Sequence, residues 1–302
     1  MSAAEVRIGT RGSALALAQA ELTLAALARA GRRGRLVIVE TAGDRRAPDT
    51  AWGEGAFVKA IERALLDGRV DLAVHSAKDV PTEEDRRLRI GGYLARADAR
   101  DALVVAEGRR ASLDELPRGA RVGTDSPRRT GFLRARRPDL VVHPLHGNVD
   151  TRLRRLDAGE TDALVLACAG LDRLGRGDRA SERLDPEVMP PAPGQGALAL
   201  QVRSEDQPML ELIAALDDQA TRHAVEAERA LLVAAGGGCR APIGAFGEVR
   251  GTELHLLGGR AEPDGAFATT RRRSGPATDS AAVVHALFDA LWPDRAPAGT
   301  LT

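Results

Sequence analysis

The stretch DLAVHSAKDVPT, residues 71–82, decides the fold because an apolar segment runs directly into a polar loop. The apolar part predicts a buried strand ending at Ser76, and Lys78 and Asp79 follow at its carboxyl end. In open α/β sheets, ligands bind beyond the carboxyl ends of the strands. The stretch therefore predicts an α/β sheet with a polar site at one edge. A local Lys–Asp pair in a solvated loop explains the same residues without a ligand.

Around this stretch, strand and helix signals alternate. Strands are predicted at 6–10, 36–41 and 71–76, and helices from Ser13 to Gly31 and over 57–66. The pattern then repeats, with strands at 101–105, 121–124, 140–145 and 163–170 and helices that begin near Ser126 and Asn148. Such alternation predicts two α/β domains of parallel strands with crossover helices.

The last third of the chain differs in character. A Pro-rich segment, 189–196, predicts a linker or crossing segment before a strand at 197–203. From about residue 219 we expect a helix over 221–234, a glycine loop, three short strands and a helix over 280–291. This order predicts a small α+β domain at the C-terminus.

Composition excludes several classes of protein. The 302 residues carry 43 basic and 43 acidic side chains, and this zero net charge argues against a nucleic-acid-binding protein. No apolar run reaches the ~18 residues of a membrane-spanning helix, and the first residues lack a secretory-signal layout. Two cysteines, Cys168 and Cys239, cannot build a disulfide framework. We expect a cytoplasmic protein that binds no membrane, and no His/Cys set has the spacing of a metal site.

Two further segments join a predicted strand to a helix N-terminus, which favours anions. GTRGS, 9–13, offers Arg11 and Ser13, and VGTDSPRR, 122–129, offers hydroxyls and a pair of arginines. Simple capped turns explain the hydroxyls without a ligand. Cys239 follows three glycines and could act as a nucleophile or attachment point, whereas Cys168 lies in an apolar run typical of the core.

Taken together, these residues predict an arginine-lined cleft for a small molecule with several carboxylates. The chain also resembles the porphobilinogen deaminase (hydroxymethylbilane synthase) family over nearly its whole length. The matching motifs include RIGTRGSALAL, AFVKAIERALL, DLAVHSAKDVPT, ARDALV, VGTDSPRR, HGNVDTRL, DALVLACAGLDRLG, PAPGQGALAL, AERALL and GGGCRAPIG.

The resemblance implies two α/β domains like those of periplasmic binding proteins and a small α+β C-terminal domain. Domain 1 would comprise 1–96 and 194–215, domain 2 would comprise 97–193, and domain 3 would comprise 216–302. It also implies a monomeric transferase of haem biosynthesis. This enzyme joins four porphobilinogen molecules head to tail, with release of ammonia, on a covalent dipyrromethane cofactor.

Site residues follow from the matching motifs. Cys239 resembles the cysteine that carries the cofactor as a thioether, and Asp79 resembles the catalytic carboxylate that stabilises the cationic azafulvene. The implied cofactor ligands are Ser13, Lys78, Asp79, Thr124, Ser126, Arg128 and Arg129. The implied substrate contacts are Arg11, Arg152, Arg173, Gln195 and His146. Arginine suits such a site because its planar fork matches carboxylates.

Three positions depart from the family pattern. His146 stands where the motif usually has arginine, Asp125 replaces one of two serines, and Glu54 lies in a short loop that often carries lysine. Each change lowers the positive potential where anions are expected. An active deaminase with an altered cleft is therefore one hypothesis, and a divergent paralogue that binds an anionic ligand or a tetrapyrrole with little turnover is the alternative.

Overall fold

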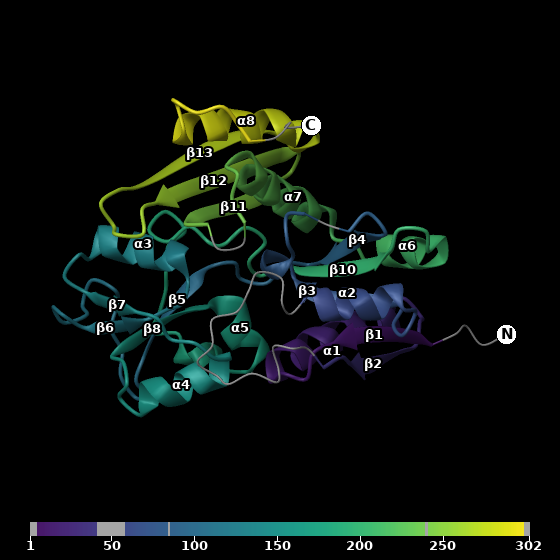
Figure 1. The fold of residues 1–302 in the computed structure, drawn as a ribbon, viewed down its shortest axis with the longest axis horizontal. Helices are drawn as coiled ribbons and strands as arrows, with labels where there is room; N and C mark the ends of the chain where they lie inside the picture. Colours follow the sequence, from purple (N-terminus) through teal and green to yellow (C-terminus); the bar gives the residue numbers. More distant parts are fainter. Residues whose placement is uncertain (1–4, 41–57, 84, 239–240, 299–302) are drawn as a thin grey trace. The chain divides into compact units, whose positions relative to one another are not determined.

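The computed structural model describes residues 5–40, 58–83, 85–238 and 241–298 (Figure 1). Contacts divide the chain into two compact units. Unit 1 comprises Met1–Arg96 and Ala197–Arg222, and unit 2 comprises Ala97–Gly196 and His223–Thr302. Each unit is built from segments that are separated in the sequence.

Unit 1 contains one five-stranded sheet in the order β2-β1-β3-β10-β4. Its elements are β1 (Val6–Thr10), α1 (Ala14–Arg29), β2 (Gly34–Ile38), α2 (Val58–Leu66), β3 (Leu72–Ser76), the short 3-10 helix η1 (Ala77–Asp79), β4 (Leu88–Leu94), β10 (Leu198–Arg203) and α6 (Gln207–Ala214). Strands β1, β2 and β3 are parallel as expected. Strand β10 is antiparallel to both β3 and β4, so the expectation of purely parallel strands was wrong.

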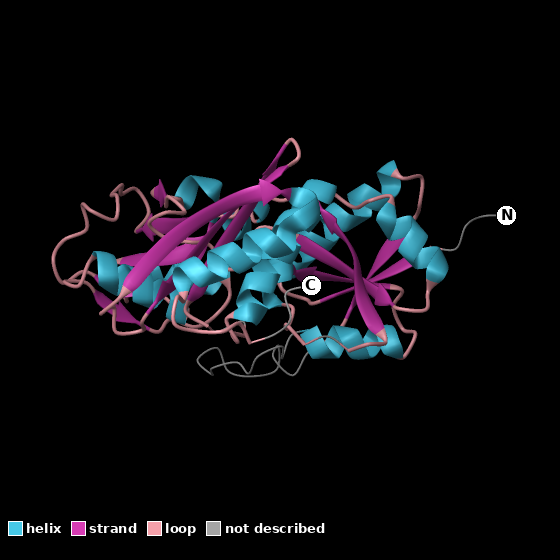
Figure 2. Cartoon of the chain, turned by 90° about the horizontal axis from the view of Figure 1, so that it is seen from above, coloured by secondary structure: helices cyan, strands magenta, loops and turns pink. Residues whose placement is uncertain are grey.

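Local chemistry explains why β1 turns into α1. The Ser13 hydroxyl accepts a hydrogen bond from the Ala16 amide at 3.3 Å and caps the helix. At the other end, Gly31 adopts a positive φ of 71°, a conformation that suits glycine. Apolar side chains of α1 and α6 cover one face of the sheet and those of α2 cover the other. Figure 2 shows helices on both sides of these strands.

Unit 2 contains a second five-stranded sheet in the order β7-β6-β8-β5-β9. Its elements are β5 (Asp101–Val105), β6 (Arg121–Gly123), α3 (Pro127–Arg136), β7 (Val141–His143), α4 (Val149–Asp157), β8 (Ala163–Ala167), α5 (Cys168–Arg173), the 3-10 helix η2 (Gly177–Arg179) and β9 (Glu182–Arg183). The strand expected over 163–170 ends at Ala167, because α5 starts at Cys168. Strand β5 is antiparallel to β8 and β9, so this sheet is also mixed.

The C-terminal part of unit 2 forms a three-stranded antiparallel sheet. Helix α7 (Gln219–Ala234) starts in unit 1 and is followed by β11 (Ile243–Arg250), β12 (Glu253–Ala261), β13 (Ala268–Pro276), the 3-10 helix η3 (Ala277–Asp279) and α8 (Ser280–Leu291). Leu231, Leu256 and Phe288 belong to one core shared by α7, the sheet and α8. The expected class, two α/β regions and a small α+β region, is confirmed by this topology.

A buried carboxylate fastens this C-terminal part to the Pro-rich segment. Glu228 on α7 is fully buried and accepts hydrogen bonds from the amides of Gly194 and Gly247, both at 2.6 Å. These two bonds join α7 to the Pro-rich segment and to β11. Among the described residues, no helix is long and apolar enough to span a membrane.

Candidate functional site

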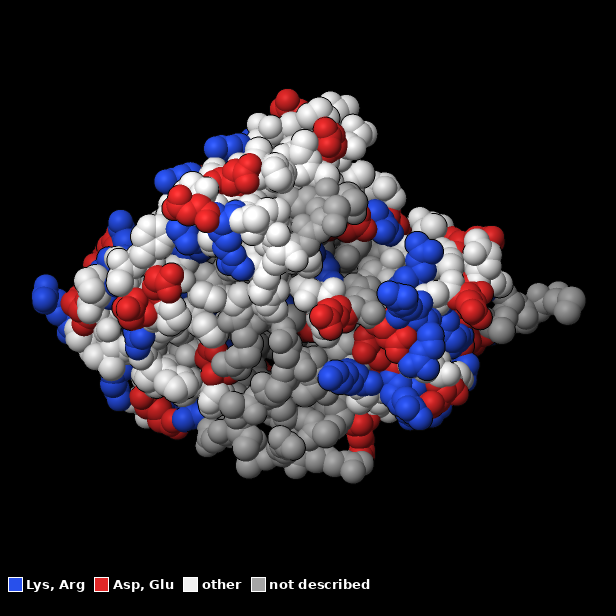
Figure 3. Space-filling view, turned by 45° about the horizontal axis from the view of Figure 1, so that its top comes forward, with Lys and Arg blue, Asp and Glu red and all other residues white. Residues whose placement is uncertain are grey.

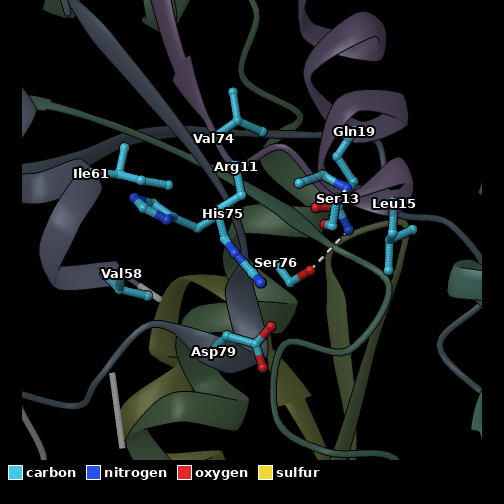
Figure 4. A pocket seen from close by; sticks show the side chains of 11 residues that line it. Arg11, Ser13, Leu15, Gln19, Val58, Ile61, Val74, His75, Ser76 and Asp79 are labelled. Carbon is cyan, nitrogen blue, oxygen red and sulfur yellow. Dashed lines mark hydrogen bonds between the residues drawn. The ribbon is translucent and has the colours of Figure 1, made fainter. Parts of the chain in front are cut away.

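A pocket lies at the carboxyl end of β3 in unit 1 (Figure 4). Residues of the first turns of α1, of α2, of the end of β3 and of η1 line it. They are Arg11, Ser13, Leu15, Ala16, Gln19, Val58, Ile61, Val74, His75, Ser76 and Asp79. The structure thus brings Arg11, Ser13 and Asp79 together, three residues that the sequence analysis selected from different motifs.

Asp79 is the acidic group of this pocket. Its side chain is accessible to solvent, yet surrounding protein atoms crowd it, and this desolvation raises its pKa. The positive charges of Lys78 and Arg11 act in the opposite direction. Among the described residues, none makes a hydrogen bond or an ion pair with the Asp79 carboxylate. The carboxylate is therefore open to a ligand, with two cations near it.

The sequence analysis gave no role to two other polar groups of the pocket, Gln19 and His75. Gln19 donates a hydrogen bond from Nε2 to the Ser76 hydroxyl at 2.9 Å, which links α1 to the end of β3. His75 is only 5% exposed and lines the pocket. A buried glutamine six residues after the Ser13 cap, and a histidine within an otherwise apolar strand, were the signals available in the sequence.

In unit 2, Arg128 and Arg129 meet a buried acid. Asp101, at the start of β5, is fully buried, and the two arginines are 3% and 6% exposed. Arg128 Nη1 lies 2.8 Å from Asp101 Oδ2, and Arg129 Nη2 lies 2.7 Å from Oδ1. Burial alone raises the pKa of Asp101, but the two adjacent guanidinium groups outweigh it and the pKa is lowered. The predicted cofactor ligands thus hold their charged ends against an internal carboxylate.

Gln195 and the predicted hydroxyl groups support this arrangement. Gln195 is fully buried and donates from Nε2 to the Ala99 carbonyl at 2.8 Å and to Asp101 Oδ1 at 2.9 Å. The structure places this amide behind Asp101 and not on an open surface. Ser126 caps α3 by accepting from the Arg129 amide, and the Thr124 hydroxyl accepts from the Ser126 amide.

Two predicted substrate contacts carry unpaired charge. Among the described residues, the Arg152 guanidinium has no hydrogen bond or ion pair, and its Nε is buried. Arg173 donates to the Gly196 carbonyl at 2.6 Å but meets no carboxylate within the described ranges, and its Nε is also buried without a partner. Burial lowers the pKa of each to about 10. Both remain cationic at pH 7.

Several surface arginines instead form ion pairs with acids. Figure 3 shows blue basic side chains beside red acidic ones over much of the visible face. The pairs Arg87–Asp85, Arg121–Asp162 and Arg179–Asp157 have nitrogen–oxygen distances of 2.6–2.9 Å. Half-buried arginines without a carboxylate, such as Arg152 and Arg173, are therefore candidates for ligand contacts.

His146 and Asp125, the two residues of unit 2 that depart from the family pattern, lie close together. His146 Nδ1 is 3.1 Å from Asp125 Oδ2, with side chains 18% and 22% exposed. Asp125 also acts on Arg152 and partly offsets the lowering of its pKa by burial. Asp125 therefore does not cap α3, a role that Ser126 takes. The acid that replaces a serine contacts the histidine that replaces an arginine.

Two of the selected positions, Cys239 and Glu54, lie outside the described residues. Cys168 is fully buried, as expected for a core residue, and burial raises the pKa of its thiol to about 12. Among the described residues, no group of three or more His, Cys, Asp or Glu side chains is arranged to hold a metal ion.

Comparisons with known proteins cover both units. Residues 6–211 match the family model for "Porphobilinogen deaminase, dipyromethane cofactor binding domain", and residues 223–291 match that for "Porphobilinogen deaminase, C-terminal domain". A solved periplasmic substrate-binding protein from Coxiella burnetii is 16% identical, with a TM-score of 0.44, over 72% of this chain and 94% of that chain.

Relatives named porphobilinogen deaminase match at higher identity. The protein of Acidothermus cellulolyticus is 49% identical over 91% of this chain and 85% of its own length. That of Roseiflexus sp. is 47% identical over 94% of both chains, and that of Deinococcus radiodurans is 46% identical over 84% of both. With two family models that together match most of the chain, these relatives show that the protein belongs to the porphobilinogen deaminase family.

Proposed function

We propose that the protein is a hydroxymethylbilane synthase, a transferase that joins four porphobilinogen molecules head to tail and releases ammonia at each step. Family membership over residues 6–211 and 223–291 carries this proposal. The pocket of unit 1 supports it, because an open carboxylate, Asp79, has Arg11 and Lys78 as its charged neighbours. This arrangement suits a substrate that bears carboxylates and develops positive charge.

The reaction requires a group that stabilises a cation. When the C–N bond of the protonated aminomethyl group of porphobilinogen breaks, the bonding electrons leave with the nitrogen as ammonia, and the positive charge passes to the pyrrole ring. Asp79 is the proposed catalytic residue, since a fixed carboxylate beside the pyrrole N–H stabilises that charge as it develops. Arg11 and Lys78 are proposed to bind carboxylates of the substrate and the cofactor, and their charge favours the ionised form of Asp79.

The residues present also fit a dipyrromethane cofactor. Arg152 and Arg173 are half-buried, and neither forms an ion pair with a carboxylate of the described residues, so both can receive carboxylates from outside the chain. When bound, a dipyrromethane supplies the terminal pyrrole carbon to which the first substrate is joined. We propose Cys239 as its attachment point. Its further contacts are proposed to be Ser13, Lys78, Asp79, Thr124, Ser126, Arg128 and Arg129.

The substrate contacts are proposed to be Arg11, Arg152, Arg173 and His146. Gln195 is better supported as a residue that positions Asp101, because its amide nitrogen donates hydrogen bonds to Asp101 and to the Ala99 carbonyl. The alternative function, binding of an anionic ligand or tetrapyrrole with little turnover, is not favoured, because relatives that are 46–49% identical over 84–94% of this chain are named porphobilinogen deaminase.

Intact mass tests the cofactor directly. The purified protein should be heavier than its sequence by two pyrrole units, and the Cys239→Ser variant should have the bare mass. Ammonia released from porphobilinogen should be fourfold the hydroxymethylbilane formed. A bare wild-type mass that persists after addition of the preassembled tetrapyrrole product, together with no ammonia release, would support the binding-protein alternative.

We further propose a monomeric, cytoplasmic enzyme with no nucleic-acid partner. The zero formal net charge supports the last point, because non-specific nucleic-acid binding depends on excess positive charge. Sedimentation at micromolar concentration should give a single species near 31.9 kDa. Salt-dependent binding to DNA should be absent.

A further inference from the structure

His75 is a pocket residue to which the proposed chemistry assigns no role. It lies on β3, four residues before Asp79, and its side chain is 5% exposed. In Figure 4 its ring lies toward Val58 and Ile61 of α2, on the side of the pocket away from Ser13 and Gln19. A buried histidine beside a ligand pocket needs a partner for each ring nitrogen.

One nitrogen has a partner through a chain of hydrogen bonds. His75 Nε2 lies 3.1 Å from Gln201 Oε1, and Gln201 Nε2 donates to Glu62 Oε1 at 3.0 Å. Strand β10 carries Gln201, which is fully buried, and α2 carries Glu62. We call the chain His75–Gln201–Glu62 the relay. It joins β3, β10 and α2, because β10 is antiparallel to β3 and α2 packs on the same sheet face.

The relay fixes which ring nitrogen carries the proton. An ionised carboxylate only accepts hydrogen bonds, so the Gln201 amide nitrogen must face Glu62. Its oxygen must then face His75, and His75 Nε2 must be the donor. Burial lowers the pKa of His75 to about 4, against a smaller opposing effect of the Gln201 contact, so the ring is neutral at pH 7. The other nitrogen, Nδ1, is left as an acceptor and makes no hydrogen bond within the described part of the chain.

We infer that Glu62, acting through Gln201, holds His75 in the Nε2–H tautomer and thereby makes Nδ1 a hydrogen-bond acceptor for an N–H donor bound in the pocket. This inference deepens the proposed function and rests on it for the donor, since each pyrrole ring of the substrate carries one N–H. Asp79 offers a charged acceptor in the same pocket, and His75 offers a neutral one. Glu62 and Gln201 are positioning residues, because they act only through the histidine.

The tautomer can be read without any variant. In the full-length protein labelled with ¹⁵N-histidine, long-range ¹H–¹⁵N spectra distinguish a protonated from an unprotonated ring nitrogen. His75, assigned by loss of its signals in His75→Asn, should show protonated Nε2 and unprotonated Nδ1 at pH 7. Addition of porphobilinogen should shift the Nδ1 signal. The opposite tautomer, or a doubly protonated ring, would overturn the inference.

Glu62→Gln tests the relay. An amide at position 62 can donate to Gln201, which lets Gln201 turn over and donate to His75 Nε2, so the proton moves to Nδ1. We expect the tautomer to change and KM for porphobilinogen to rise about tenfold, the size of one lost hydrogen bond, with kcat changed less. The matched control is Glu21→Gln, an exposed position on α1 that should change neither quantity.

The tautomer spectra and the KM measurements together separate a failure of the inference from a failure of the proposed function. An unchanged tautomer in Glu62→Gln would overturn the relay, and a changed tautomer with an unchanged KM would overturn the contact with the ligand. If wild-type protein released no ammonia from porphobilinogen, the proposed function would fail. The tautomer spectra would still decide whether Glu62 controls His75.

Discussion

Asp79 in unit 1 and Asp101 in unit 2 each have two cationic neighbours, yet their pKa values move in opposite directions. The pKa of Asp79 is raised, because desolvation outweighs Lys78 and Arg11. The pKa of Asp101 is lowered, because Arg128 and Arg129 lie within 2.7–2.8 Å of its oxygens. Direct contact, more than the number of charges nearby, decides the outcome.

The comparison separates two roles for charge in one chain. The Asp101 group is closed: each carboxylate oxygen meets a guanidinium, and Gln195 adds a further hydrogen bond. The Asp79 carboxylate is accessible and has no partner among the described residues. Removal of an ion-paired buried acid leaves its cations without a counter-charge and destabilises the fold, whereas an accessible acid without a partner is available for chemistry.

The largest expected effect is on the closed cluster. Asp101→Asn leaves two buried guanidinium groups without a counter-charge, which should lower the free energy of unfolding by about 3–5 kcal/mol. Urea unfolding followed by circular dichroism measures the loss. Asp162→Asn is the control, because Asp162 pairs with Arg121 with 45% of its side chain exposed and should cost at most about 1 kcal/mol. Equal losses would remove the distinction between buried and exposed pairs.

Asp79→Asn should lower activity strongly and leave stability unchanged, the reverse of Asp101→Asn. We expect turnover to fall about 100- to 1000-fold, because the amide cannot stabilise the developing cation by charge. The urea midpoint should stay within error of wild type, since no described residue bonds to the carboxylate. Initial rates of ammonia release measure the effect. Near-normal rates would remove Asp79 from the mechanism.

Arg152→Gln tests whether a cation without a carboxylate partner acts, like Asp79, in activity and not in stability. Loss of a charged hydrogen-bond donor should raise KM for porphobilinogen about 10- to 100-fold. The urea midpoint should hold or rise, because a desolvated cation without a partner is removed. Arg154→Gln, on the same helix but exposed, supplies the control and should leave KM unchanged. A drop in stability with normal KM would make Arg152 structural.

The smallest effect concerns His146. Because Asp125 lies 3.1 Å from its ring, His146→Arg alone should create an Arg–Asp pair and leave KM nearly unchanged. The double variant His146→Arg/Asp125→Ser should free that guanidinium and lower KM by a few-fold, about 1 kcal/mol. A double-mutant cycle of wild type, His146→Arg, Asp125→Ser and the double variant measures the coupling between the two positions. If His146→Arg alone lowers KM as much as the double variant, the pair is not coupled.

Local signals in the sequence predicted much of the fold. Ser13 and Gly31 mark α1, Ser126 and Pro127 mark the start of α3, and the strand 101–105 and the helix 280–291 were predicted at their observed bounds. Capping side chains and left-handed glycines act within a few residues, so the sequence alone expresses them. The antiparallel direction of β10 depends on the connection of more than one hundred residues between β4 and β10, so no local pattern in the sequence predicts it.

Strand β4 and helix α6 were missed for a physical reason. Gly91 and Gly92 interrupt the apolar pattern of β4, and glycine weakens an isolated strand. In the structure, a Cβ at Gly92 would lie 2.9 Å from the side chain of Ile213, so α6 packs directly on this glycine. A glycine that reads as a strand breaker in sequence is here required for close packing.

For the candidate site, motifs identified the residues but not their partners. Arg128 and Arg129 were selected as ligands for cofactor carboxylates, and the motifs did not show that both also contact Asp101 inside the chain. An aspartate at the start of the apolar segment DALVV was the available signal, because a buried acid needs paired cations. The contact between Asp125 and His146 joins two loops that follow different strands, and no local pattern encodes it.

The position of β10 between β3 and β4 has a consequence for synthesis on the ribosome. Among the strands that the structure describes, β4 pairs with β10 alone, and β10 is encoded about one hundred residues after β4. While unit 2's first sheet is being translated, β3 therefore has an open edge and β4 has no neighbour. Unpaired edges are where nascent chains associate wrongly. The N-terminal unit cannot be completed first, so its folding is tied to the emergence of residues 198–203.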